Sequence, residues 1–219
     1  IVATLFLSSL MKDVSFKDFD ILSEQDKAEA VALVQRYDQL EVQDGCQGDF
    51  ISFIKHMWPD FIEGRHHKII ANKFNKIADG KLKRLIVCLP PRHSKSEFAS
   101  TFFPAWMMGR RGNLKIIQTT HTAELAVRFG RKVRNIIDST EYQHIFPDLK
   151  LQADNKSAGR WTSNQEGEFF AAGVGGAITG RGADLLIIDD PHSEQDALSP
   201  KALESAYEWY TSGPRQRLQ

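Results

Sequence analysis

The residues with the clearest chemical potential lie between an apolar run and an amphipathic one. The apolar run is residues 85–89, and a polar turn ending in Lys95-Ser96 follows it. This is the layout of a phosphate-binding loop, in which backbone N–H groups hold phosphate oxygens, the lysine neutralises the outer phosphates and the serine hydroxyl reaches Mg²⁺. The residues expected to surround a bound nucleotide are Pro91, Arg92, His93, Ser94, Lys95, Ser96 and Glu97.

The loop departs from the usual spelling, G-x-x-x-x-G-K-[ST]. Leu89 and Ser94 stand where the two glycines belong. If the backbone at Ser94 needs a positive φ, a residue other than glycine carries strain there. The alternative interpretation is a Pro-Pro turn after a buried strand, with Lys95 and Ser96 simply starting a helix. On this motif alone, both interpretations stay open.

A second chemical feature lies downstream, where the apolar residues 185–188 are followed by Asp189 and Asp190. A short continuous apolar run predicts a strand buried on both faces of a parallel sheet, and ligands bind at the carboxyl ends of such strands. Beside a phosphate loop, Asp189 would hold Mg²⁺ and Asp190 would orient or deprotonate the attacking water. An Asp-Asp-Pro turn is the alternative. Together, in this order, the two features favour an ATPase that uses ATP and Mg²⁺.

Composition limits the remaining possibilities. The 219 residues carry 28 basic and 28 acidic side chains, so any DNA-binding surface must be local. Cys46 and Cys88 lie far apart, which predicts neither a disulfide framework nor a zinc cluster. No apolar run has the length of a membrane span, so no membrane partner is expected. We also expect the chain to be a fragment of a longer protein.

The pattern along the chain predicts a helical extension over residues 1–44, a linker at 44–48 and one α/β domain over 45–219. Strands that alternate with helices predict a mostly parallel, doubly wound sheet with helices on both faces. The expected helices are 50–57, 66–79, 95–108, 122–137 and 198–210, and the expected strands are 85–89, 114–119, one at Trp161, 168–172 and one ending at Asp189.

Four segments, taken in order, resemble the large subunit of tailed-phage terminases, the DNA-packaging motor. They are residues 90–96, 119–126, 175–184 and 186–191, and the resemblance runs from about residue 50 to the end. It implies a P-loop NTPase fold of the ASCE/RecA-like type and ATP hydrolysis that powers translocation of double-stranded viral DNA into a procapsid. The family's nuclease domain is expected to be absent from this chain.

The resemblance also implies roles for residues of the loop and the acidic strand. Lys95 matches the phosphate-loop lysine, Ser96 the Mg²⁺ ligand and Asp189 the metal-associated acid. Arg92 matches an arginine that senses or stabilises the γ-phosphate, although a solvated loop charge is the alternative.

Three further roles are less closely matched. Asp190 falls where many relatives carry a catalytic Glu, and Glu194 is a possible substitute base; position favours Asp190. Arg181 is a candidate arginine finger that reaches a neighbouring subunit's nucleotide, or else a structural arginine in a turn. His67 could hydrogen-bond the adenine base, although a surface histidine at a helix start is the commoner situation.

The partners implied are double-stranded DNA, a portal protein, a small terminase subunit and further copies of this chain in a ring, in the host cytoplasm. Four basic residues of the helix 122–137 could track DNA phosphates, although such runs are usually solvated faces. They are Arg128, Arg131, Lys132 and Arg134. Two rival functions remain: a helicase-like, nucleic-acid-dependent ATPase, and a nucleotide-binding assembly or adaptor protein without turnover.

Overall fold

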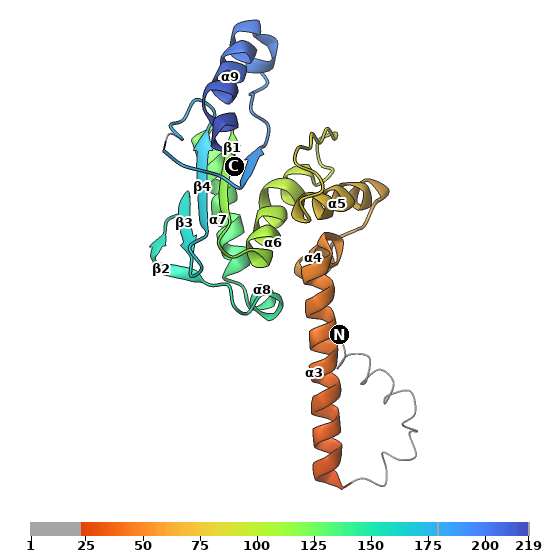
Figure 1. The fold of residues 1–219 in the computed structure, drawn as a ribbon. Helices are drawn as coiled ribbons and strands as arrows, with labels where there is room; N and C mark the ends of the chain where they lie inside the picture. Colours follow the sequence, from red (N-terminus) through yellow and green to blue (C-terminus); the bar gives the residue numbers. More distant parts are fainter. Residues whose placement is uncertain (1–22, 179, 219) are drawn as a thin grey trace. The chain divides into compact units, whose positions relative to one another are not determined.

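The computed structural model of the chain describes residues 23–178 and 180–218, and the chain divides between Val42 and Gln43 into two compact units (Figure 1). Helix α3 (Glu24–Gly48) begins after Ser23, whose hydroxyl accepts the backbone N–H of Asp26 at 3.2 Å. The expected helical extension is therefore present from Glu24 onward. Its first part, residues 1–22, lies outside the described residues.

The linker expected at residues 44–48 is wrong, because α3 continues through them. Tertiary contacts within the second unit account for the difference. Cys46 is 4% exposed, and the side-chain amides of Gln43 and Gln47 both donate to the carbonyl oxygen of Ile145. These contacts outweigh the weak helix propensity of Gly45 and Gly48.

A five-stranded sheet forms the centre of the second unit, with the order β2-β3-β4-β1-β5. Strand β1 is parallel to β4 and to β5, whereas β2–β3 and β3–β4 are antiparallel. The protein is therefore a mixed α/β structure, and the prediction of a mostly parallel sheet holds only for three neighbouring strands. The strands are β1 (Lys115–Thr120), β2 (Leu151–Lys156), β3 (Arg160–Ser163), β4 (Glu168–Gly173) and β5 (Leu185–Ile188).

The antiparallel half has a local cause. Only four residues, 164–167, connect β3 to β4, and so short a connection permits only an antiparallel pair. The turn is tight: Ser163 Oγ accepts the backbone N–H groups of Gln165 and Gly167, and Glu166 has φ 65°.

The expected strands at 114–119 and 168–172 and the one ending at Asp189 are confirmed closely, and each expected helix from residue 50 onward is confirmed within a few residues. Local capping explains this accuracy, since Asp49, Thr122 and Ser199 each accept a backbone N–H in the first turn of the helix that follows. The helices are α4 (Phe50–Met57), α5 (Arg65–Ala78), the π-helix η1 (Glu97–Phe102) continuous with α6 (Phe103–Arg110), α7 (Ala123–Ile137), α8 (Thr140–Ile145) and α9 (Pro200–Ser212).

The main core lies between the helices and one face of the sheet. Ile116 and Phe169 belong to this face, and α7 packs directly against β4 and β1. Phe50 is fully buried and makes edge-on contacts with four aromatic rings, whose centroids lie 5.3–5.7 Å away. These contacts fix α4, α5 and α6 on one another.

The other face of the sheet carries a smaller core. Ile117 and Ala172 point to this face and pack with Ile178 and Ala183, from the connection between β4 and β5. Trp209 of α9 packs against the same cluster. That connection and α9 therefore cover the face opposite α7.

The prediction of a strand at residues 85–89 is wrong, because in the described structure this segment pairs with no other strand. Its side chains alternate: Leu85, Val87 and Leu89 pack against the main core, while Ile86 is 89% exposed. The apolar run is therefore packed on one side only, because no neighbouring strand covers the other.

Candidate functional site

The side chain of Lys95 meets the two carboxylates that follow β5. Its ammonium group forms an ion pair with Asp190, and its Nζ lies 3.8 Å from Asp189 Oδ1. From the helix that follows the loop, Ser100 Oγ donates to Asp189 Oδ2 at 2.8 Å. We call Lys95, Ser100, Asp189 and Asp190 the Lys95 site. The helix start and the acidic strand thus meet at the carboxyl edge of the parallel strands, 95 residues apart in sequence.

The electrostatics of this site depend on unequal burial. Asp189 is 6% exposed, whereas 61% of the Asp190 side chain is exposed. Burial alone would lower the pKa of Lys95, but the hydrogen bond to Asp190 and the charges of both carboxylates outweigh it and raise that pKa. Lys95 therefore stays an ammonium cation over the whole physiological range.

Backbone hydrogen bonds hold the two carboxylates in place. The N–H of Asp189 donates to the carbonyl of Thr119 at 2.9 Å, and the N–H of His121 donates to the carbonyl of Asp190 at 3.2 Å. The β1–β5 pairing is thereby extended past the last paired residue of β5. Both acids leave the sheet at the same edge as the end of β1.

Backbone strain concentrates at this site. Arg92 has φ 64°, Ser94 has φ 60° and Asp190 has φ 43°, and Glu166 is the only other described residue besides glycine with a positive φ. Such conformations cost about 1–3 kcal/mol each and cluster where the surrounding structure enforces them, often at functional sites. Ser94 has the conformation that the glycine of the usual motif would supply.

The rest of the expected nucleotide loop lies open to solvent. Pro91, Arg92 and His93 are exposed, and His93 Nδ1 lies 2.9 Å from the carbonyl oxygen of Pro91. Glu97 is directed elsewhere, because it forms an ion pair with Lys132 of α7. The Lys132 ammonium group is thus engaged in a contact between helices and is not available to bind a DNA phosphate. Ser96 lies in the first turn of the helix and is partly buried.

His67 is not a surface histidine: it is 6% exposed. Its Nδ1 accepts the backbone N–H of Gly64 at 2.9 Å, and its ring stacks on Phe98 with centroids 4.9 Å apart. Burial lowers its pKa, with the neighbouring His66 acting in the same direction, so the ring is neutral. Because Nδ1 accepts, Nε2 carries the proton, and this buried N–H has no partner among the described residues.

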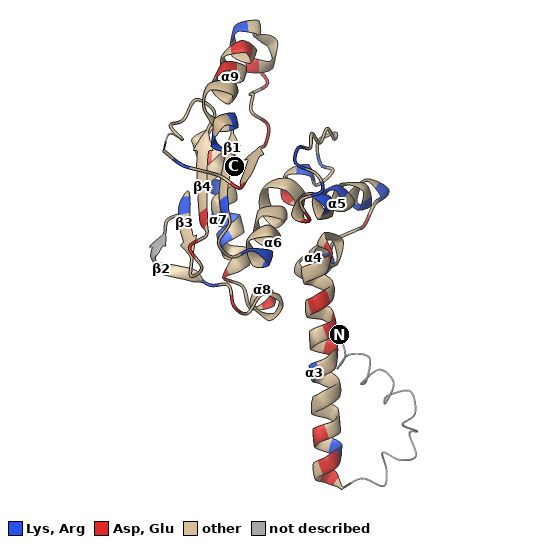
Figure 2. Ribbon diagram, in the orientation of Figure 1, with Lys and Arg blue, Asp and Glu red and all other residues tan. Residues whose placement is uncertain are grey.

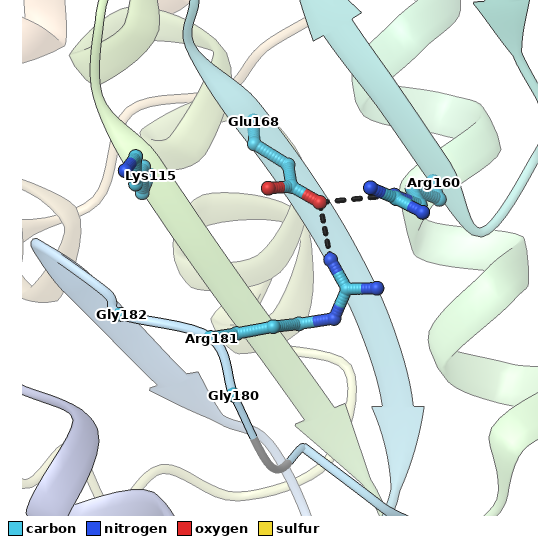
Figure 3. Close-up of a pocket in the computed structure, with 6 residues that line it drawn as sticks. All are labelled: Lys115, Arg160, Glu168, Gly180, Arg181 and Gly182. Atoms are coloured by element: carbon cyan, nitrogen blue, oxygen red, sulfur yellow. Dashed lines mark hydrogen bonds and ion pairs between the residues drawn. The ribbon is translucent and has the colours of Figure 1, made fainter.

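Arg181 lies at the opposite edge of the sheet. It pairs with Glu168, the first residue of β4 (Figure 3). Its guanidinium also lies 4.1 Å from the centroid of the Phe170 ring. Strands β1 and β4 are six residues long, so this edge lies roughly 17 Å from the carboxyl edge at about 3.3 Å per residue. Arg181 comes four positions before β5, so it must lie at the N-terminal edge of the parallel strands. This position could have been inferred from the sequence.

Glu194 is exposed in the turn before the short 3₁₀ helix at Asp196–Leu198. Sequence reasoning missed two histidines in the same region. His121 follows β1 and His192 follows Pro191, and each has one buried ring nitrogen without a partner among the described residues. Hydrogen bonds from Ser193 lower the pKa of Asp196, and the charges of His192 and His121 act in the same direction.

The donor set suits a hard cation better than a zinc-type site. In the described part of the chain, no group of three or more His, Cys, Asp or Glu side chains is arranged to hold a metal ion. Mg²⁺ keeps several waters and needs only one or two carboxylates beside substrate phosphates. Asp189 and the hydroxyl of Ser96 are oxygen donors of that kind, and Lys95 supplies the cation that phosphates require.

A comparison of the sequence with protein-family models and with curated proteins found no match. Among the described helices, none is both long enough and apolar enough to cross a membrane.

Proposed function

We propose that this chain is an ATPase of the terminase large-subunit type, which couples ATP hydrolysis to the translocation of double-stranded viral DNA. The observation that carries the proposal is the ion pairing of Lys95 with Asp189 and Asp190. A lysine at a helix start and two acids after a buried strand are the parts that a phosphate-binding loop and its acidic strand contribute. The strain at Arg92 and Ser94 supports a functional loop.

The residues fit ATP and Mg²⁺ through their charges and donors. Lys95 would bind the outer phosphates, and Ser96 and Asp189 would hold the metal ion. When bound, Mg²⁺ neutralises charge that develops on the phosphate oxygens. Phosphates would compete with Asp190 for Lys95, which would free the exposed Asp190 carboxylate to orient a water and take its proton. Glu194, exposed in the next turn, is the alternative base.

Two arginines have different places in this proposal. Arg92 is exposed in the loop, where it can turn toward a γ-phosphate. Arg181 lies at the far edge of the sheet and would act only on the nucleotide of a neighbouring copy, in a ring that brings that edge to the neighbour's Lys95 site. His67 would use its free Nε2 proton to donate to an adenine nitrogen after a side-chain rearrangement around Phe98.

The proposed P-loop NTPase fold requires residues 85–89 to form a strand beside β5. Strand β5 is at the edge of the described sheet, and Ile188 is 36% exposed. A bridge from Ala183 to Leu218 occupies only the start of that edge. Amide exchange tests this step: slow exchange at Ile86 and Cys88 is expected once a nucleotide analogue binds, and unchanged fast exchange at both would contradict the proposed fold.

A basic surface supports DNA as the partner. In Figure 2, Lys and Arg cover much of α5, and residues 65–84 contain seven basic side chains and one acid, Asp79. Asp79 is paired with Lys81 and lies 3.5 Å from Arg110. Since the whole chain has no net charge, this local excess is a specific feature. The portal protein, the small subunit and the ring are proposed from the family resemblance.

Phosphate release from ATP tests the proposed activity. We expect turnover by the wild type with DNA and portal protein, loss of turnover in Lys95→Ala, and at least a hundredfold loss in Asp190→Asn, which keeps the shape but not the base. Lys201→Ala removes an exposed lysine of α9 and should leave turnover unchanged. Wild-type protein that binds ATP without releasing phosphate, alone or with DNA and portal, would instead support an adaptor. Strand separation coupled to turnover would support a helicase.

A further inference from the structure

A pocket of about 360 Å³ opens at the N-terminal edge of β1 and β4, on the sheet face opposite α7 (Figure 3). It is lined by Lys115, Arg160, Glu168, Gly180, Arg181 and Gly182, and we call it the Arg181 pocket. Lys115 and Glu168 are the first residues of neighbouring parallel strands and pair with each other in register. Strands β1, β3 and β4 thus each contribute one charged side chain, and the approach to β5 contributes Arg181.

A single oxygen of the Glu168 carboxylate binds both Arg160 and Arg181. Glu168 Oε1 accepts from Arg160 Nε at 3.0 Å and from an Nη of Arg181. The Arg181 guanidinium also stacks on the ring of Phe170, which restricts its orientation. As Figure 3 shows, the two guanidinium groups approach Glu168 from different directions, and each keeps nitrogen donors that face away from it.

The charge in this pocket is not balanced by its own residues. Three cations and a single carboxylate line it, so two positive charges remain. Asp184 lies close by, but its carboxylate is bound to the backbone N–H of Lys115 at 2.8 Å. Planar guanidinium groups with spare donors match the oxygens of a phosphate group, which can carry two negative charges.

Gly180, next to Arg181, leaves room for a ligand. Gly180 has φ 78°, and a side chain there would meet no atom within 4 Å, so the space beside it is open. Nothing in the proposed ATPase mechanism within one subunit uses this space, because the Lys95 site lies at the other edge of the sheet. We propose that the Arg181 pocket is a second phosphate-binding site of this protein, separate from the Lys95 site.

Titration with inorganic phosphate tests the site directly. The Lys95→Ala protein is the background, because it removes the lysine of the other candidate phosphate site. We expect saturable binding in this background, weakened about tenfold or more by Arg160→Gln, since a hydrogen bond to a charged group is worth about 1.5–3 kcal/mol. Lys115→Gln should weaken binding similarly, without touching the contact between Glu168 and the arginines. Arg36→Gln, which removes an exposed arginine of α3, should leave the affinity unchanged.

Duplex DNA distinguishes the two sources of a phosphate group. If the pocket takes a DNA phosphate, Arg160→Gln should reduce the slope of log K against log salt concentration by about one. If that slope is unchanged while inorganic phosphate binding is lost, the ligand is a free phosphate or a nucleotide. Phosphate affinity that is equal in the Lys95→Ala background with and without Arg160→Gln and Lys115→Gln would overturn the proposal. So would binding of poly-glutamate in place of phosphate, which would indicate an acidic protein partner.

Discussion

Replacing Ser94 by glycine is expected to stabilise the folded protein, although glycine usually destabilises. Ser94 has φ 60°, a left-handed conformation that costs an L-residue about 1–2 kcal/mol. Glycine avoids this cost but loses about 0.5–1 kcal/mol more conformational free energy on folding. The Ser94 hydroxyl makes no hydrogen bond within the described structure, so no contact is lost. The net expectation is a gain of about 0.5–1 kcal/mol in the free energy of unfolding.

Urea unfolding followed by tryptophan fluorescence measures this gain. At an m-value of about 2.5 kcal/mol/M, the midpoint should rise by about 0.3 M with an unchanged m-value. Ser96→Gly is the matched control, because Ser96 has φ −70° and ψ −34°. The same replacement there should lower the midpoint by a similar amount.

Glu166→Gly tests the effect of relieving a positive φ at a position outside the candidate site. Glu166 has φ 65° in the turn between β3 and β4, so glycine should stabilise there as well, without changing the loop before Lys95. A midpoint that falls in Ser94→Gly while it rises in Glu166→Gly would refute the assignment of strain to Ser94.

Three further results are expected. Ser100→Ala should lower the free energy of unfolding by about 1–3 kcal/mol, because it leaves the buried Oδ2 of Asp189 without its donor; calorimetry with Ser212→Ala, an exposed serine, as control would measure it. Phe50→Ala should cost about 3–5 kcal/mol in urea unfolding, since four aromatic rings lose a fully buried neighbour, and a cost below 1 kcal/mol would contradict this packing. The raised pKa of Lys95 contributes stability that is fully present below its unfolded pKa of about 10.4 and is lost as pH rises through the higher folded pKa. Wild type should therefore lose more stability than Lys95→Met as the pH rises above about 10, and parallel curves would contradict the ion pair.

Local signals in the sequence predicted the helices well, and long-range pairing limited the prediction of the strands. Thr122 and Asp49 cap their helices by accepting the backbone N–H of the residue three positions later. Such a local contact can be predicted from the sequence pattern. Residues 85–89 have the composition of a buried strand, but a strand needs a partner, and composition does not supply one. Strands at Trp161 and 168–172 were expected, but strand β2 and the antiparallel pairing were not, although a four-residue connection between β3 and β4 permits only that pairing.

The Lys95 site could be anticipated in outline because one topological rule governs it. Carboxyl ends of parallel strands share an edge, which brought Asp189 and Asp190 to the end of β1. The contact from Ser100 could not be anticipated, since it depends on the exact rotation of the helix after the loop. His67 was expected either to contact the adenine base or to lie at the surface, and its burial against Phe98, far away in sequence, could not be anticipated.

The π-helix at Glu97–Phe102 sets the angle at which the loop meets the sheet. A π-turn contains about one residue more than an α-turn, and one residue corresponds to about 100° of rotation along an α-helix. Trp106 is fully buried and fixes α6 in the core. The rotation therefore changes the direction of the residues at the N-terminal end of the helix. Lys95 and Ser96 thus owe their direction to a single inserted residue. If the insertion were removed, the helix would keep its core contacts and turn the lysine about a quarter of a circle away from both acids.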